Sequence, residues 1–173
     1  MDSKKTWKVS LIGPAGVGKS SLVSRIVYGS DGAGFDPKAM KRKSVVYEKS
    51  GLKLSADLFF LELGTGGGDD KLLSGSNAIV IVSDVTNGRS LDDADKLLKY
   101  TKTFSEKSVR ILVATKQDLR YEAQFWENEL KELAAKHGVP YVLTSAKNGS
   151  DSGRFLDALV DSLAGKFVQK GKN

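Results

Sequence analysis

The sequence predicts an α/β fold, in which a six-stranded and mostly parallel sheet with one antiparallel edge strand is covered by about five helices. Apolar strand patterns alternate along the chain with segments of helical spacing, and the run Ala-Ile-Val-Ile-Val at residues 78–82 is typical of a strand buried on both faces. Two neighbouring strand patterns are joined by Ser50-Gly51, which predicts a hairpin and hence the antiparallel strand. The 173 residues suit one domain spanning residues 1–173.

The elements follow one another in a regular order. The first strand leads into a helix whose Leu22, Val23, Ile26 and Val27 share one face, and a later helix stops at Gly138. The expected strands are residues 7–12, 44–48, 52–63, 78–83, 109–114 and 141–143, and the later helices are residues 92–104, 123–137 and about 154–167. Ligands of such sheets bind beyond the carboxyl ends of the strands, so the loops at those ends are the candidate site.

The loop after the first strand reads Gly-Pro-Ala-Gly-Val-Gly-Lys-Ser at residues 13–20, which matches the pattern G-x-x-x-x-G-K-[ST]. Glycines let the backbone wrap closely around a polyphosphate, and N–H groups at the start of a helix attract its charge. The Lys19 ammonium would reach the β- and γ-phosphates, and the Ser20 hydroxyl would bind Mg²⁺. The expected phosphate contacts are Gly13, Ala15, Gly16, Val17, Gly18, Lys19, Ser20 and Ser21.

Composition excludes several other classes of site. The chain has no cysteine, which excludes disulfides, thiolate metal sites and cysteine nucleophiles. Membrane association would therefore be indirect unless a lipidated tail has been removed, and the lack of a signal peptide favours the cytoplasm. The net charge is +6, but the basic residues are spread out and lack interleaved aromatics, so we expect a solvated surface and no nucleic-acid partner. His137, at a helix end, is expected to complement the helix dipole.

Two later strand-end loops narrow the ligand. They read Thr115-Lys116-Gln117-Asp118 and Thr144-Ser145-Ala146-Lys147, and they resemble the [NT]-K-x-D and S-A-K motifs of the Ras superfamily of small GTPases. The stretch at residues 83–91 is also similar to the sequence that follows the fourth strand in Ras and Rab proteins. The resemblance runs along nearly the whole chain and implies the G domain of P-loop NTPases, with GTP or GDP and Mg²⁺ as cofactors.

The resemblance also implies how the base is read. The Asp118 carboxylate would accept hydrogen bonds from the guanine N1–H and exocyclic amine, which adenine does not present in that geometry. The aliphatic stem of Lys116 would lie along the base, and the backbone N–H of Ala146 would meet the guanine O6. Thr115, Ser145 and Lys147 complete the expected base site.

The sequence departs from the family in the loops that sense the γ-phosphate. Where the family has [YF]-D-P-T, this chain has Phe35-Asp36-Pro37-Lys38. An ammonium cannot bind Mg²⁺, so Lys38 cannot replace the threonine as a metal ligand. Lys38 either contacts phosphate as a point charge or is solvated. Glu62 replaces the aspartate that holds a water of the metal. Thr65 stands where a glycine N–H meets the γ-phosphate, and Gly66 stands where a glutamine orients the attacking water.

A further departure concerns the base. The aromatic residue that often stacks on it is replaced by Asp31, with Tyr28 or Phe35 as substitutes. Phe35 and Lys38 are nonetheless included among the expected nucleotide contacts.

Three functions are therefore open. The first is a regulatory small GTPase with very slow or absent intrinsic hydrolysis, in which Lys19 and Gly66 occupy the catalytic positions, Ser20 and Glu62 the metal site, and residues 29–43 and 64–76 bind a protein partner. The second is a pseudo-GTPase that serves as a structural subunit of a trafficking, cytoskeletal or ciliary complex. The third, a P-loop kinase or ATPase, gives no reason for residues 115–118 and is disfavoured.

Overall fold

The computed structural model describes residues 4–29, 40–49, 51–65, 70–104, 106–145 and 149–168. These residues form a six-stranded sheet in the order β2-β3-β1-β4-β5-β6. Its strands are β1 (Lys5–Ile12), β2 (Lys41–Lys49), β3 (Leu52–Leu63), β4 (Ala78–Asp84), β5 (Val109–Thr115) and β6 (Tyr141–Leu143). The pair of β2 and β3 is antiparallel, whereas the other strand pairs are parallel. The predicted mixed sheet with its hairpin is therefore confirmed.

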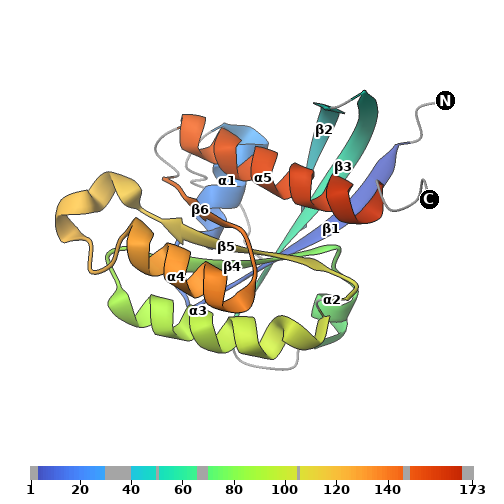
Figure 1. Ribbon diagram of the computed structural model, residues 1–173. Helices are drawn as coiled ribbons and strands as arrows, with labels where there is room; N and C mark the ends of the chain where they lie inside the picture. The colour runs from blue at the N-terminus through green and yellow to red at the C-terminus, as the bar shows by residue number, and fades with distance from the viewer. Residues whose placement is uncertain are drawn as a thin grey trace.

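Helices cover both faces of the sheet (Figure 1). The helix α1 (Lys19–Tyr28) lies with α5 (Gly149–Phe167) on one face, and α3 (Gly88–Thr101) lies with α4 (Glu127–His137) on the other. A short α2 (Asp70–Ser74) follows β3, and two 3₁₀ segments are η1 (Lys102–Phe104) and η2 (Gln117–Glu122). No helix within the described parts of the chain is long and apolar enough to cross a membrane.

The core has two parts, one on each side of the sheet. Phe60 and Phe155 are buried on the side of α1 and α5, and Leu98 and Leu130 are buried on the side of α3 and α4. All seven residues of β4 are buried, as expected of a central strand covered on both faces. Burial on both faces holds the carboxyl ends of β1, β4 and β5 side by side, where the predicted site lies.

Several helix boundaries differ from the predicted ones. Helix α3 begins at Gly88 and not at residue 92, because the Asn87 side chain accepts a hydrogen bond from the Arg89 N–H at 3.1 Å and caps the helix. Helix α4 begins at Glu127 and not at residue 123, because Trp126 is extended and its N–H donates to Glu129 Oε2 at 3.0 Å. Helix α5 begins at Gly149, five residues before the expected start. Helix α2 lies within residues 64–76, the second segment expected to bind a partner, where no helix was predicted.

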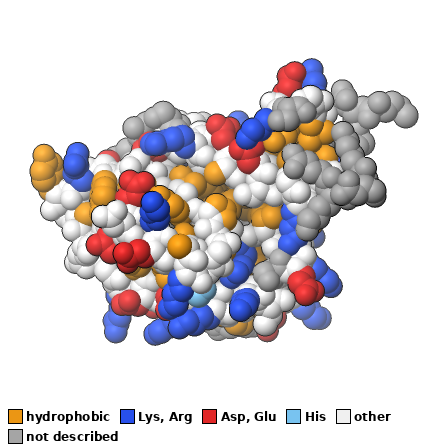
Figure 2. Space-filling model, in the orientation of Figure 1, with side chains coloured by type: hydrophobic (Ala, Val, Ile, Leu, Met, Phe, Trp, Pro, Cys, Tyr) orange, Lys and Arg blue, Asp and Glu red, His pale blue; other side chains and the backbone are white. Residues whose placement is uncertain are grey.

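His137 lies in the last turn of α4, as expected for a residue that complements the helix dipole. Its Nε2 also contacts Asp95 Oδ1 of α3 at 2.7 Å, a partner that the sequence did not indicate. Lys136 and Lys99 contact the same carboxylate at 3.2 and 3.3 Å. Figure 2 shows the histidine among basic side chains on the lower part of the molecule. The histidine therefore belongs to a cluster that joins α3 to α4.

Candidate nucleotide site

The loop at residues 13–18 joins the end of β1 to the start of α1, and two of its glycines are required by close packing. A Cβ on Gly13 would lie 2.6 Å from the carbonyl oxygen of Val82 in β4. Gly18 has a φ of 102°, and a Cβ there would lie 3.2 Å from Thr115 Oγ1. The loop is thus packed against the ends of β4 and β5 at the start of α1, and the N-terminus of a helix is where anions bind.

Lys19 lies over this loop. Its Nζ donates hydrogen bonds to the carbonyl oxygens of Gly13 and of Pro14, the latter at 3.4 Å. Burial lowers the pKa of the Lys19 ammonium from its ordinary value, and the nearby Glu62 carboxylate opposes that shift. The ammonium is held at the loop that the sequence assigns to phosphate, where a polyphosphate would favour its charged form.

Ser20 and Glu62 meet between α1 and the end of β3. The Ser20 hydroxyl donates to Glu62 Oε1 at 2.6 Å. The other oxygen, Glu62 Oε2, is buried and has no hydrogen-bond partner among the residues that the structure describes. A hydroxyl and an unpartnered carboxylate oxygen are ligands that suit Mg²⁺, directly or through its waters. These two residues therefore fit the metal that the sequence predicts here.

Thr115, at the end of β5, lies against the phosphate loop. Its hydroxyl donates to the carbonyl oxygen of Val17 and to that of Ser83, the latter at 3.0 Å. The side chain is buried, and its hydroxyl is hydrogen-bonded to the backbone of the phosphate loop and of β4. The geometry thus gives Thr115 a structural contact that joins the base loop to the phosphate loop.

Lys116 has a left-handed backbone with a φ of 65°. Within the described ranges it is the only non-glycine residue with a positive φ. Its Nζ donates to the carbonyl oxygen of Gly16 at 3.0 Å and to Asp84 Oδ2 at 2.7 Å. The lysine stem therefore crosses from the end of β5 to the phosphate loop. The sequence predicts that this stem also lies along the base.

Asp84 is a site residue that the sequence reasoning missed. Its Oδ2 accepts from Lys116 and its Oδ1 accepts from the N–H and hydroxyl of Thr86, at 2.8 and 2.7 Å. The sequence does contain a signal for Asp84, because this residue lies in the stretch at residues 83–91 that resembles Ras and Rab proteins. The contact to Lys116 became visible only with the pairing of Asp84 and Thr115 across β4 and β5.

The two base loops are joined to each other. Asp118 Oδ1 accepts a hydrogen bond from the Ser145 hydroxyl at 2.6 Å, and the Gln117 N–H donates to the Thr144 carbonyl oxygen at 3.2 Å. Ser145 and Asp118 thus lie together, as expected for two parts of one base site. Ala15 and Ser21 lie in the phosphate loop and in the first turn of α1, respectively, with Ala15 exposed.

Some predicted residues cannot be placed. Phe35, Lys38, Gly66, Ala146 and Lys147 lie outside the described residues, as does Asp31. Thr65 is exposed just after β3, and Tyr28 is 58% exposed at the end of α1. Of the two segments expected to bind a partner, the structure describes Gly29, residues 40–43, 64–65 and 70–76.

A sequence model described as the Ras family matches residues 68–164, which is more than half of the chain. This chain belongs to the Ras family. The matched range includes both base loops, whereas the phosphate loop lies before it. Members of the family are small GTPases, which generally bind guanine nucleotide with Mg²⁺.

Similarity to individual members of the Ras family extends over most of the chain. Ras-related protein Rab-18 of Lymnaea stagnalis is 27% identical over 91% of this chain and 80% of its own length. Ras-related protein SEC4 of Candida albicans is 25% identical over 94% and 80%. Ras-related protein Rab-27A of Rattus norvegicus is 26% identical over 90% and 77%. The resemblance to Ras and Rab proteins stated from the motifs is thereby confirmed.

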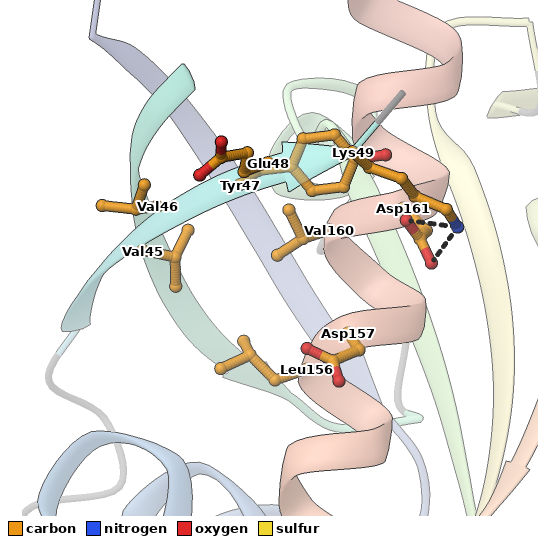
Figure 3. Close-up of a pocket in the computed structure, with 9 residues that line it drawn as sticks. All are labelled: Val45, Val46, Tyr47, Glu48, Lys49, Leu156, Asp157, Val160 and Asp161. Carbon is orange, nitrogen blue, oxygen red and sulfur yellow. Dashed lines mark hydrogen bonds and ion pairs between the residues drawn. The ribbon is translucent and has the colours of Figure 1, made fainter. Parts of the chain in front are cut away.

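A separate cavity of about 440 Å³ lies between β2 and α5 of this Ras-family protein. Figure 3 shows Val45 and Tyr47 of β2 facing Leu156 and Val160 of α5. Lys49 Nζ pairs with Asp161 Oδ1 across its end at 3.3 Å. The predicted nucleotide contacts that the structure describes do not line this cavity, so we assign it no part in nucleotide binding.

Proposed function

We propose that this Ras-family protein binds GTP and GDP with Mg²⁺, hydrolyses GTP very slowly on its own and acts through protein partners. The observation that carries the nucleotide proposal is the convergence of three loops. Lys116 contacts Gly16, Thr115 contacts Val17, and Asp118 contacts Ser145, so the base motifs and the phosphate loop form one continuous surface.

Each residue has a role in this proposal. The loop N–H groups and Lys19 bind the phosphates, the Asp118 carboxylate accepts from guanine, and the Lys116 stem covers the base. Ser20 and Glu62 hold the metal, which when bound neutralises charge on the β- and γ-phosphates. Ser145 keeps the Asp118 carboxylate directed toward the base by its hydrogen bond. The remaining predicted contacts from residues 30–39, 66–69 and 146–148 complete the site in this proposal.

Slow hydrolysis is argued from two residues of the sequence, one that precedes β2 and one that follows β3. Gly66 has no side chain that could orient the attacking water, and Lys38 has no oxygen to bind the metal. Catalysis of phosphoryl transfer depends on positioning and electrostatics, so the loss of both parts removes most of the intrinsic rate. Partner binding through residues 29–43 and 64–76 would then carry the biological output, in the cytoplasm.

The test is to denature freshly purified protein and identify the released nucleotide by chromatography, and then to measure single-turnover hydrolysis of loaded GTP. We expect guanine nucleotide at one equivalent, with GTP that persists for hours. Adenine nucleotide in the site would contradict the binding proposal. Hydrolysis complete within minutes and without a partner would contradict the proposal of slow hydrolysis.

The second candidate, a pseudo-GTPase subunit of a larger complex, is favoured by the same two residues, Lys38 and Gly66. It keeps the fold and a bound nucleotide but has no cycle. A partner that binds the GDP and GTP forms with equal affinity would support this candidate, because a ligand with no differential affinity shifts no equilibrium. A partner that prefers the GTP form would support the regulatory GTPase.

A further inference from the structure

The middle residue of the first base loop contacts the first turn of α5. Gln117 lies between Lys116 and Asp118, and its Nε2 donates a hydrogen bond to Asp151 Oδ2. Asp151 belongs to the first turn of α5 and is only 3% exposed. Its other oxygen, Oδ1, accepts from Arg154, whose side chain is 67% exposed. Among the described residues, both carboxylate oxygens of this buried group are therefore accounted for.

The contact lies where the backbone needs support. Lys116 adopts the left-handed conformation, which costs free energy for a residue with a Cβ and persists only where the surroundings hold it. Gln117 is held by two hydrogen bonds. Its backbone N–H donates to the Thr144 carbonyl oxygen, and its side-chain amide donates to Asp151. Fixing Gln117 sets the directions of its two neighbours, Lys116 and Asp118.

We propose that Gln117 and Asp151 are positioning residues that hold the base loop in the geometry that selects guanine. The proposal rests on the proposed function and concerns the same site. A buried carboxylate that loses a hydrogen-bond donor is left with an unpaired oxygen, so removing the Gln117 amide favours movement of the loop. Movement would take Asp118 out of line with the exocyclic amine of guanine, which it would otherwise recognise.

Exchanging the amide of Gln117 and the carboxylate of Asp151 tests whether their hydrogen bond positions the loop. In Gln117→Glu two carboxylates face each other and repel. In Gln117→Glu with Asp151→Asn the amide and the carboxylate exchange places, which restores a charge-assisted hydrogen bond. Arg154→Gln is the matched control, because it removes the exposed partner of Asp151 and leaves the buried contact to Gln117 in place.

The measurement is the dissociation rate of fluorescently labelled GDP and IDP from the loaded full chain, with circular dichroism as a check on folding. IDP lacks the exocyclic amine, so the ratio of its rate to that of GDP reports alignment of Asp118. We expect Gln117→Glu to release GDP roughly tenfold faster or more and to bring the ratio toward one. The double variant should recover both values, and Arg154→Gln should keep the wild-type ratio.

Two results would overturn the inference: a ratio that stays unchanged in Gln117→Glu because both nucleotides are released faster by the same factor or not at all, or no recovery in the double variant. If Gln117→Glu does not fold, Gln117→Leu replaces it, and the same ratio is read. Failure of the proposed function looks different, because the wild-type protein itself would then show no preference for GDP over ADP.

Discussion

In the proposed function, guanine selectivity depends on Asp118. Its carboxylate lies in η2, just after β5, and accepts a hydrogen bond from Ser145 at 2.6 Å. Asp118→Ala removes the acceptor for two guanine hydrogens, and we expect it to weaken GDP binding by roughly a hundredfold or more, since unpaired polar groups in a base site cost several kcal/mol. Titration with labelled GDP measures the loss.

The matched control for this prediction is Tyr121→Ala, a change of an almost fully exposed side chain in η2. It should leave GDP affinity unchanged. If Asp118→Ala bound GDP as tightly as the wild-type protein, the base would not be read by this loop.

Single residues also show where sequence reasoning succeeds and where it stops. The phosphate loop could be predicted because its glycines and lysine are set by local backbone geometry and occur in one continuous stretch. The contact of Asp84 with Lys116 could not, because 32 positions separate the two residues and only the pairing of β4 with β5 brings them together. The contact of Gln117 with Asp151 spans 34 positions for the same kind of reason.

At the scale of elements, the strands were predicted closely and the helix starts were not. Strand ends follow apolar runs that must be buried, whereas helix starts depend on which polar side chain reaches a backbone N–H. Asn87 and the backbone of Trp126 set the starts of α3 and α4, and neither lies in an apolar pattern. The Asn87 cap is therefore expected to contribute to the stability of α3.

Asn87→Ala should lower the free energy of unfolding by about 1 kcal/mol, because the Arg89 N–H at the start of α3 loses its acceptor. Urea unfolding followed by circular dichroism measures the change. Lys96→Ala, an exposed substitution in the same helix, is the control and should have little effect, since alanine is a good helix former. A loss in the control equal to that in Asn87→Ala would show that the cap is not the cause.

The cluster that joins α3 to α4 makes stability depend on pH. The hydrogen bond from His137 first, and those from Lys136 and Lys99, lower the pKa of the Asp95 carboxyl from 3.8 to about 2. A carboxyl whose pKa is lower in the folded state stabilises the protein above its unfolded pKa, and this contribution is lost as the pH falls through the folded pKa. The relevant window is therefore from about pH 4 down to about pH 2.

Asp95→Asn should lower the free energy of unfolding at pH 7 by about 1 kcal/mol, a modest value because solvent screens a carboxylate that is a quarter exposed. The difference from the wild-type protein should shrink between pH 4 and pH 2, where the wild-type carboxyl becomes protonated. Urea unfolding at several pH values measures both quantities, with the exposed Asp92→Asn as control. An undiminished difference at the acid end would contradict the assignment to this ion-pair cluster.

For the whole molecule, the order of the strands decides where the chemistry lies. Strand β1 is central, between β3 and β4, and β4 pairs with β5, so the loops after β1, β3, β4 and β5 converge at one edge of the sheet. The sequence predicted the alternation of strands and helices and the antiparallel hairpin, and the motifs placed the site at that edge. The strand order itself depends on long-range pairing, which no local pattern contains.

Selective binding of guanine nucleotide at this site underlies the proposed function. The most direct measurement is titration calorimetry of nucleotide-free protein with GDP and with ADP, each in the presence of Mg²⁺. We expect GDP to bind at one equivalent, with an affinity at least a hundredfold above that of ADP, since a base site with a carboxylate acceptor rejects adenine by several kcal/mol. Equal affinity for the two nucleotides, or binding of neither, would contradict it.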